Sequence, residues 1–168
     1  MVDNNPISLV PRPLTRERFA PYGDVIETSP GAASAMNDAR FERFDDLCDV
    51  DLAGGEVRIS VSRCRTPSAL PLRVDKVERH ALGSQAFVPL SRIAMVIVVA
   101  PPGEDVWAED LRAFVTNGRQ GFNYHRGTWH MPLIGLEAGQ EFLVVDRGGE
   151  DANCELHEFD EIIMLERV

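Results

Sequence analysis

The chain has 168 residues, of which 44% are hydrophobic and 26% are charged, and it carries a formal net charge of −10 at pH 7. This composition excludes a disordered chain and predicts one folded domain over residues 1–168. The acidic charge repels phosphate backbones and anionic lipid, so we expect neither a nucleic acid nor a membrane as a partner.

The N-terminal residues 1–14 lack the basic and then apolar pattern of a secretory signal. No apolar run approaches the ~20 residues that a membrane-spanning helix needs. We therefore expect a cytoplasmic protein. The three cysteines, Cys48, Cys64 and Cys154, fit neither a disulfide framework nor a zinc ribbon, and we expect buried, reduced thiols.

The first element along the chain is a short helix, because Thr15 is a suitable N-cap and Glu17 follows in the first turn. From residue 57, apolar residues alternate with Arg and Ser, which is the period of a half-buried strand. Further strand patterns cover residues 70–80, 92–100, 128–136, 141–147 and 161–168. Many short strands and few helical periods predict an all-β (mainly β) protein, either a β-barrel or a jelly-roll sandwich.

The segment at residues 92–100, RIAMVIVVA, is apolar on both faces of a strand. It therefore predicts a central strand, covered by the barrel interior on one side and by another layer on the other. A second subunit is one candidate for that layer. A buried helix would give the same run, but its length and its valines and isoleucines favour a strand.

The segment at residues 70–80 changes character along its length. Alternation places one series of side chains on a single face: Leu70, Leu72, Val74, Lys76, Glu78 and His80. Such a face fills the core of a small barrel at its apolar end and lines a polar pocket at its ionisable end. The alternative is a strand that leaves the core, with its last residues solvated.

Polar residues crowd residues 117–133, in a loop that runs into a strand, and loops on rigid scaffolds often carry function. Within it, His125, Gly127 and His130 match the PxGxxH core of the second cupin motif, with histidine in the place of proline. The earlier ERHALGSQAF resembles the first cupin motif, HxH followed by Glu, with Glu78 at the first histidine and Gln85 at the glutamate.

These two motifs supply ligands for a transition metal. Glu78, His80, Gln85 and His130 would form a mixed nitrogen and oxygen set, of the type that leaves positions open for a substrate. The alternative is that His80 and His130 are hydrogen-bonded pocket residues without a metal.

Four blocks of the sequence resemble the ureidoglycolate lyase family: YGDVIE, LPLRVDKVERHALGSQAFVPL, FVTNGRQGFNYHRGTWHMPL and FLVVDRGG, between residue 22 and about residue 149. The resemblance implies a cupin-type jelly-roll β-barrel with a few short helices, a homodimer, and nickel as the divalent metal. It also implies a carbon–nitrogen lyase of the amidine-lyase type, which splits (S)-ureidoglycolate into glyoxylate and urea during allantoin and purine catabolism. Two positions depart from the family: Met131, where HHPL is common, and Lys76, at an apolar position.

The resemblance and the polar residues together suggest a mechanism. A metal held by His80, Gln85 and His130 would bind the hydroxyl and carboxylate of the substrate and lower the pKa of the hydroxyl. Glu78 or His125 would take its proton, and His125 would act as the acid toward urea.

The remaining site residues are expected to bind the substrate. Arg119 or Arg126 would hold the carboxylate, and Asn123 and Tyr124 would hydrogen-bond the ureido group. Two rival functions stay open: a noncatalytic cupin that senses a small acid, and a different metal-dependent cupin enzyme, such as an oxygenase or isomerase.

Overall fold

The structure is a computed structural model that describes residues 6–29 and 32–168. In chain order its elements are β1 (Ile7–Leu9), β2 (Arg12–Pro13), α1 (Arg16–Phe19), β3 (Gly23–Ile26), β4 (Ser34–Met36), β5 (Phe41–Arg43), β6 (Glu56–Arg63), β7 (Leu72–Arg73), β8 (Lys76–Arg79), β9 (Gln85–Pro89), β10 (Val96–Ala100), the 3-10 turn η1 (Ala108–Asp110), β11 (Arg112–Val115), β12 (Gly121–Tyr124), β13 (Trp129–His130), β14 (Glu141–Gly148), β15 (Glu155–Glu158) and β16 (Ile163–Leu165). Strands dominate, which confirms the predicted mainly β, cupin-like fold.

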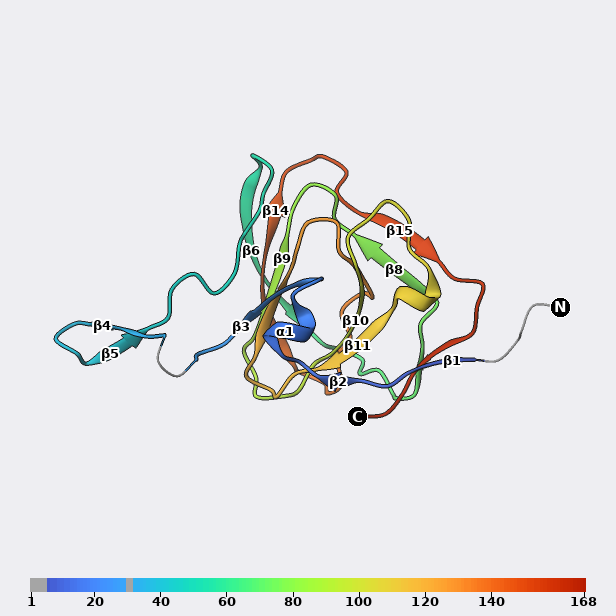
Figure 1. Ribbon diagram of the computed structural model, residues 1–168, viewed down its shortest axis with the longest axis horizontal. Coiled ribbons are helices and arrows are strands. Elements are labelled where there is room, and N and C mark those ends of the chain that lie inside the picture. Colours follow the sequence, from blue (N-terminus) through green and yellow to red (C-terminus); the bar gives the residue numbers. More distant parts are fainter. Residues whose placement is uncertain (1–5, 30–31) are drawn as a thin grey trace.

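Two large sheets form the body of the molecule (Figure 1). One has the strand order β3-β12-β9-β14-β6, and the other β15-β8-β13-β10-β11-β2. A third sheet, β1-β16-β7, packs on the second, and the β4–β5 hairpin projects from the body. Most neighbours are antiparallel, whereas β1 with β16 and β2 with β11 are parallel.

Strand β10 separates two apolar clusters. Ile97 and Val99 face an inner, aromatic-rich cluster between the two large sheets, and Val96 and Val98 face an outer cluster toward β16. The expected central strand is confirmed. Both of its faces are covered by layers of the same chain, so β10 needs no second subunit for its cover.

The strand expected over residues 70–80 is broken into β7 and β8, which belong to different sheets. Val74 and Val77 both enter the outer cluster although they are three residues apart, so the alternation does not continue between them. Leu72 therefore packs on the outer cluster while Glu78 faces a cavity on the inner side, and the predicted single face is wrong. Lys76 is exposed.

Strand β6 is present where the alternation predicted it, but only Ser62 is partly buried and its other residues are exposed. Val57, Ile59 and Val61 are 57%, 66% and 55% exposed, so their face of this edge strand is not half-buried. The polar Ser60 and Ser62, on the opposite face of the strand, line a cavity.

The short helix is confirmed as α1, where the Thr15 side chain accepts a hydrogen bond from the Arg18 N–H at 3.3 Å. The strand expected over residues 128–136 is reduced to β13, and β12 lies within the expected loop. None of the described helices is long and apolar enough to span a membrane.

Candidate functional site

Three polar side chains converge on the inner side of β8 and β13. One ligand atom each from Glu78, His80 and His130 lie within 4.8 Å of one another, and the two imidazole centroids are 5.2 Å apart. The strand register explains part of this convergence, because Glu78 and His130 are directly opposite each other across the β8–β13 pair. We call these three residues the metal-site cluster. The predicted meeting of His80 and His130 is confirmed.

A tight turn joins the two histidine-bearing segments. Residues 125–128 are closed by a hydrogen bond from the Thr128 N–H to the His125 carbonyl, and Gly127 at the third position has a φ of 80°. Glycine adopts this left-handed conformation without the cost that a Cβ would add. The Gly127 N–H then donates to the His80 carbonyl at 2.9 Å, so the turn ties β8 to the start of β13.

The hydrogen bonds of the two imidazoles fix their tautomers. Nδ1 of His80 lies 2.7 Å from the Asn153 carbonyl oxygen, and Nδ1 of His130 lies 2.9 Å from that of Thr128. A carbonyl oxygen only accepts, so each Nδ1 carries the proton. Both Nε2 atoms are buried and have no hydrogen-bond partner within the described part of the chain.

Two free lone pairs therefore face a carboxylate in a confined space. The Nε2 atom of His130 lies 3.5 Å from Oε1 of Glu78. Neutral imidazole and carboxylate at this distance repel unless a proton or a metal cation lies between them. Two atoms bound to one ion at ~2.1 Å lie at most ~4.2 Å apart, so a slight contraction suits a first-row transition metal. Backbone partners on Nδ1 are also what histidine ligands commonly have.

Glu78 keeps a negative charge at neutral pH. With a proton on Nε2, His130 donates to the carboxylate, and this hydrogen bond is the largest influence that lowers the pKa of Glu78, although burial acts in the opposite direction. The Cys154 thiol donates to the other carboxylate oxygen at 3.7 Å. All three cysteines are free, as expected, but Cys154 is exposed and Cys48 and Cys64 are only partly covered, so the expected burial is wrong.

A cavity of about 230 Å³ opens beside the metal-site cluster. It is smaller than the usual range for drug-sized ligands, and therefore suits a small metabolite. Gln85 lines it, as expected, together with Tyr124, whose ring stacks on His130 at 4.3 Å between centroids. Burial raises the pKa of Tyr124 far above its usual value, so its hydroxyl stays protonated.

One row of side chains crosses the floor of this site. Arg58, Asp146, Gln85 and Tyr124 are opposite one another on four neighbouring strands. Gln85 donates to Asp146 at 3.3 Å, and Nε of Arg58 lies 3.4 Å from Oδ1 of Asp146. Asp146 and Arg58 also line an adjoining cavity of about 270 Å³ together with His80.

Arg58 and Asp146 were not among the residues predicted for the site. The signal was present in the alternation of β6, because Arg58 shares the face of Ser60 and Ser62. This face was not considered for the site, because the apolar face of β6 was expected to point inward.

Four residues expected in the site lie outside the lining of both cavities. Nε2 of His125 is 3.1 Å from Oδ1 of Asp24, and Asn123 is fully buried and donates to Asp24 and to the Asp49 carbonyl. Arg126 pairs with Asp51 at 3.2 Å, and Arg119 is exposed. We call Asp24, Asn123 and His125 the Asp24 cluster.

Glycine is required where β3 approaches β12. A Cβ at Gly23 would overlap the Asn123 carbonyl oxygen. The glycine of YGDVIE therefore serves the packing that brings Asp24 to Asn123.

The sequence matches known proteins over nearly its whole length. The family model described as ureidoglycolate lyase matches residues 6–166. A ureidoglycolate lyase of Pseudomonas syringae pv. syringae is 49% identical over 158 residues, which cover 94% of this chain and 93% of that protein. Proteins of the same name from Pseudomonas fluorescens and Pseudomonas putida are 48% and 46% identical, over 92% and 94% of this chain and 93% and 95% of their own lengths.

Proposed function

The chain belongs to the ureidoglycolate lyase family, and from this premise we propose that it is an enzyme that splits (S)-ureidoglycolate into glyoxylate and urea beside the metal-site cluster. The observation that carries the proposal is the meeting of two buried, unpartnered Nε2 atoms with the Glu78 carboxylate at the edge of a small cavity. The proposed class is a carbon–nitrogen lyase of the amidine-lyase type.

A divalent transition metal fits the residues present. His80 and His130 would hold it through Nε2, with oxygen from Gln85, which leaves the Glu78 carboxylate beside the ion free to carry protons. The family resemblance makes nickel the proposed ion. When bound, such an ion supplies Lewis-acid polarisation of a substrate oxygen.

The protein's own residues can balance the proton transfers. Cleavage removes the proton of the substrate hydroxyl, breaks the carbon–nitrogen bond, forms the carbonyl of glyoxylate and returns a proton to the urea nitrogen. We assign both transfers to Glu78, because it is ionised and lines the cavity. His125 is not assigned the acid step, because it is paired with Asp24 outside the cavity lining.

Two neighbours would orient the substrate. Tyr124 lines the cavity and keeps its hydroxyl proton, so it can hydrogen-bond the ureido group. Arg58 and Arg147 line the cavity shared with His80 and Asp146. Arg147 is already engaged with Asp151 at 2.9 Å and with the Leu52 carbonyl, so we assign the substrate carboxylate to Arg58 in place of Arg119 or Arg126. The Arg58 side chain is already aligned, because it donates to the Arg147 carbonyl at 2.7 Å.

The test is to incubate purified protein with racemic ureidoglycolate, with and without added nickel and a chelator, and to measure glyoxylate, urea and ammonia separately. We expect equal amounts of glyoxylate and urea, with one enantiomer consumed. Ammonia in place of urea would indicate a hydrolase. Substrate binding without products would indicate a sensor, and oxygen-dependent turnover with iron would indicate a different cupin enzyme.

We also propose that the protein is a homodimer, as the family resemblance implies. The support is the outward face of β6, where the exposed Ile59 and Val61 are opposite Val145 and Leu143 of β14 and extend the apolar surface across two strands. Ile59→Glu should convert a dimer into a monomer in light scattering, whereas the same change at the exposed Val10, on another surface, should not. A wild-type monomer would refute this part.

The chain-level predictions form part of the same proposal: one domain over residues 1–168, and a cytoplasmic location. The contribution of β10 to both apolar clusters supports the single domain. One cooperative unfolding transition, seen by several probes, would test it. Cell fractionation would test the location.

A further inference from the structure

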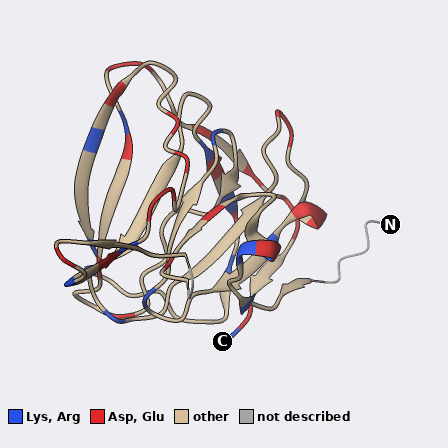
Figure 2. Ribbon diagram, turned by 60° about the vertical axis from the view of Figure 1, so that its left-hand side comes forward, with Lys and Arg blue, Asp and Glu red and all other residues tan. Residues whose placement is uncertain are grey.

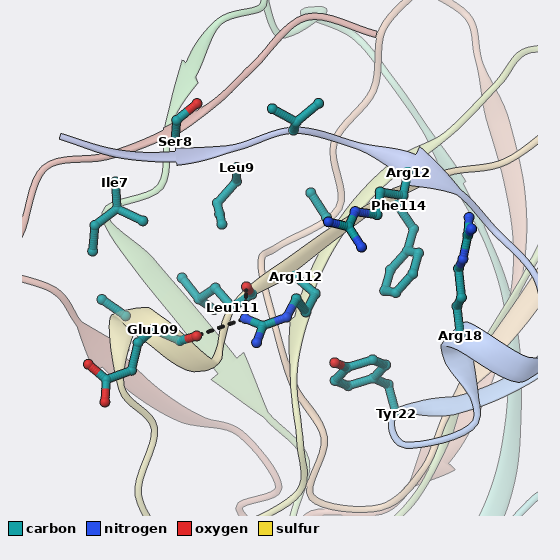
Figure 3. Close-up of a pocket in the computed structure, with 13 residues that line it drawn as sticks. Ile7, Ser8, Leu9, Arg12, Arg18, Tyr22, Glu109, Leu111, Arg112 and Phe114 are labelled. Carbon is teal, nitrogen blue, oxygen red and sulfur yellow. Dashed lines mark hydrogen bonds between the residues drawn. The ribbon is translucent and has the colours of Figure 1, made fainter.

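A second, larger cavity lies between the N-terminal segment and β11, away from the metal-site cluster. Its volume is about 470 Å³, and it shares no lining residue with the two cavities described above. Figure 3 shows that its walls come from β1, β2, the region of α1, and the η1–β11 segment. A cavity of this size is within the range that holds small-molecule ligands.

Three guanidinium groups line this cavity: those of Arg12, Arg18 and Arg112. None of the three forms an ion pair with an acidic residue in the described part of the chain. Arg112 is held in place, because its Nη1 donates to the carbonyls of Glu109 and Leu111, both at 2.7 Å. All three arginines are also exposed to solvent, so an anion could reach them from outside.

The neighbouring acidic and polar groups do not neutralise these arginines. Acidic residues are spread along the whole ribbon (Figure 2), as the net charge of −10 requires. The Glu109 side chain lines the cavity, but its carboxylate points away from the three guanidinium groups in Figure 3. The Ser8 hydroxyl is engaged with Glu166 at 2.8 Å. The cavity is therefore locally basic on an acidic protein.

Tyr22 adds a neutral donor to the cavity wall. Its ring is buried against Phe114, with centroids 5.8 Å apart, and its hydroxyl points into the cavity (Figure 3). The hydroxyl makes no hydrogen bond to another described residue. Burial raises the pKa of Tyr22, so the hydroxyl keeps its proton at neutral pH. Leu9, Leu111 and Phe114 supply an apolar wall.

We propose that this cavity is a binding site for a small organic oxyanion with at least two negative charges, which Arg12, Arg18 and Arg112 hold while its carbon skeleton lies on the apolar wall. Guanidinium groups match carboxylate and phosphate oxygens in the same way, so the shared chemistry is a multivalent oxyanion. The site is distinct from the one proposed for ureidoglycolate cleavage and does not depend on that function.

Isothermal titration calorimetry of the purified protein tests the site with two probes, glycerol 3-phosphate for the phosphate source and tricarballylate for the carboxylate source. We expect at least one probe to bind at one site per chain. Arg112→Gln and Arg12→Gln should each weaken binding about tenfold or more, because each removes a charge-assisted hydrogen bond. Arg40→Gln, at an exposed arginine of the distant hairpin turn, is the matched control and should bind like the wild type.

Binding by one probe alone would support the site and identify the source of the oxyanion. His130→Asn should leave binding unchanged, which separates this site from the metal-site cluster. No binding of either probe, or equal weakening by Arg40→Gln and Arg112→Gln, would overturn the proposal. Circular dichroism of each variant checks that the fold is retained.

Discussion

The metal-site cluster and the Asp24 cluster each contain a carboxylate and histidine, yet the carboxylates and imidazoles of the two clusters are hydrogen-bonded differently. In the metal-site cluster, two buried Nε2 atoms have no hydrogen-bond partner. In the Asp24 cluster, the carboxylate receives hydrogen bonds from Asn123, from the Asp49 N–H and from His125. The residue types of both clusters had suggested a functional site in the sequence.

From this difference we infer that the metal-site cluster is a candidate ligand site and that the Asp24 cluster holds the chain together. A buried group without a partner costs free energy and persists where function requires it, whereas a carboxylate with three hydrogen bonds contributes to folding. The Asp24 cluster has one buried atom without a partner among the described residues, Oδ1 of Asn123, but its carboxylate and its histidine are both engaged. The Asp24 cluster joins β3, β12 and the segment before β6, which are far apart in sequence. We therefore expect changes in the first cluster to affect activity and changes in the second to affect stability.

The largest expected effect is the loss of turnover in Glu78→Gln. It removes the proposed proton carrier with little change in volume, so glyoxylate release should fall by about 10²–10⁴-fold. Stability should change little, because the contacts of the Glu78 carboxylate with His130, at 3.5 Å, and with the Cys154 thiol, at 3.7 Å, are long. His125→Gln is the matched control from the Asp24 cluster and should keep near-wild-type turnover. Equal losses in the two variants would end the distinction between the clusters.

Metal binding should stabilise the protein through the metal-site cluster alone. At a nickel concentration of 100 times Kd, the free energy of unfolding should rise by about 2.7 kcal/mol, and chelator should reverse the change. His130→Asn should abolish the effect, and His125→Gln should leave it intact. Thermal unfolding with and without nickel measures this. A stabilisation that survives in His130→Asn would place the metal elsewhere.

Asn123→Ala should have the opposite effect to Glu78→Gln: a loss of stability without a loss of turnover. Asn123 is fully buried and its amide donates twice, so its removal leaves the Asp24 carboxylate and the Asp49 carbonyl short of donors. We expect a loss of about 1–3 kcal/mol of unfolding free energy in urea, with kcat unchanged. A fall in kcat without a loss of stability would make Asn123 a substrate contact.

The smallest effect concerns pH. Burial alone would raise the pKa of Asp24, but the hydrogen bonds from Asn123, the Asp49 N–H and His125 lower it overall. A lowered folded-state pKa contributes stability above the unfolded value of ~3.9, and this contribution is lost as pH falls through the folded pKa. Because Asp24 is partly exposed, we expect less than about 1 kcal/mol.

Urea midpoints measured across this acid range, for the wild type and for Asp24→Asn, test that contribution. The variant should lose part of the wild-type dependence on pH. Identical slopes for the two proteins would show that Asp24 does not contribute.

The predictable part of the fold was the part governed by local pattern. The helix cap at Thr15, the alternation of β6 and the all-apolar β10 each follow from side-chain chemistry within a few residues. The break between β7 and β8 could not be predicted, because Val74 and Val77 both enter the outer cluster only once β16 has paired with β7.

The candidate site divides in the same way. The motif spacing indicated Glu78, His80, Gln85 and His130, and the structure places all four at one site. Tyr124 and Asn123 were both predicted to bind the substrate, but only Tyr124 lines the cavity. Asn123 belongs to the Asp24 cluster, because adjacent strand residues point to opposite faces. Strand register decides which of two adjacent residues faces the cavity. The polar composition of residues 117–133 predicted a loop there, so the register of β12 could not be predicted.

The amino-acid sequence by itself determined the mainly β architecture, the family and the two histidine-bearing motifs, because each depends on residue types at short, fixed spacings. Only the tertiary structure decided which face of β6 lines the cavities, that Arg58 and Asp146 lie beside His80, and that His125 binds Asp24 instead. The physical reason is that register and sheet packing are set by contacts between residues distant in the chain, and one residue of shift exchanges the inner and outer faces of a strand.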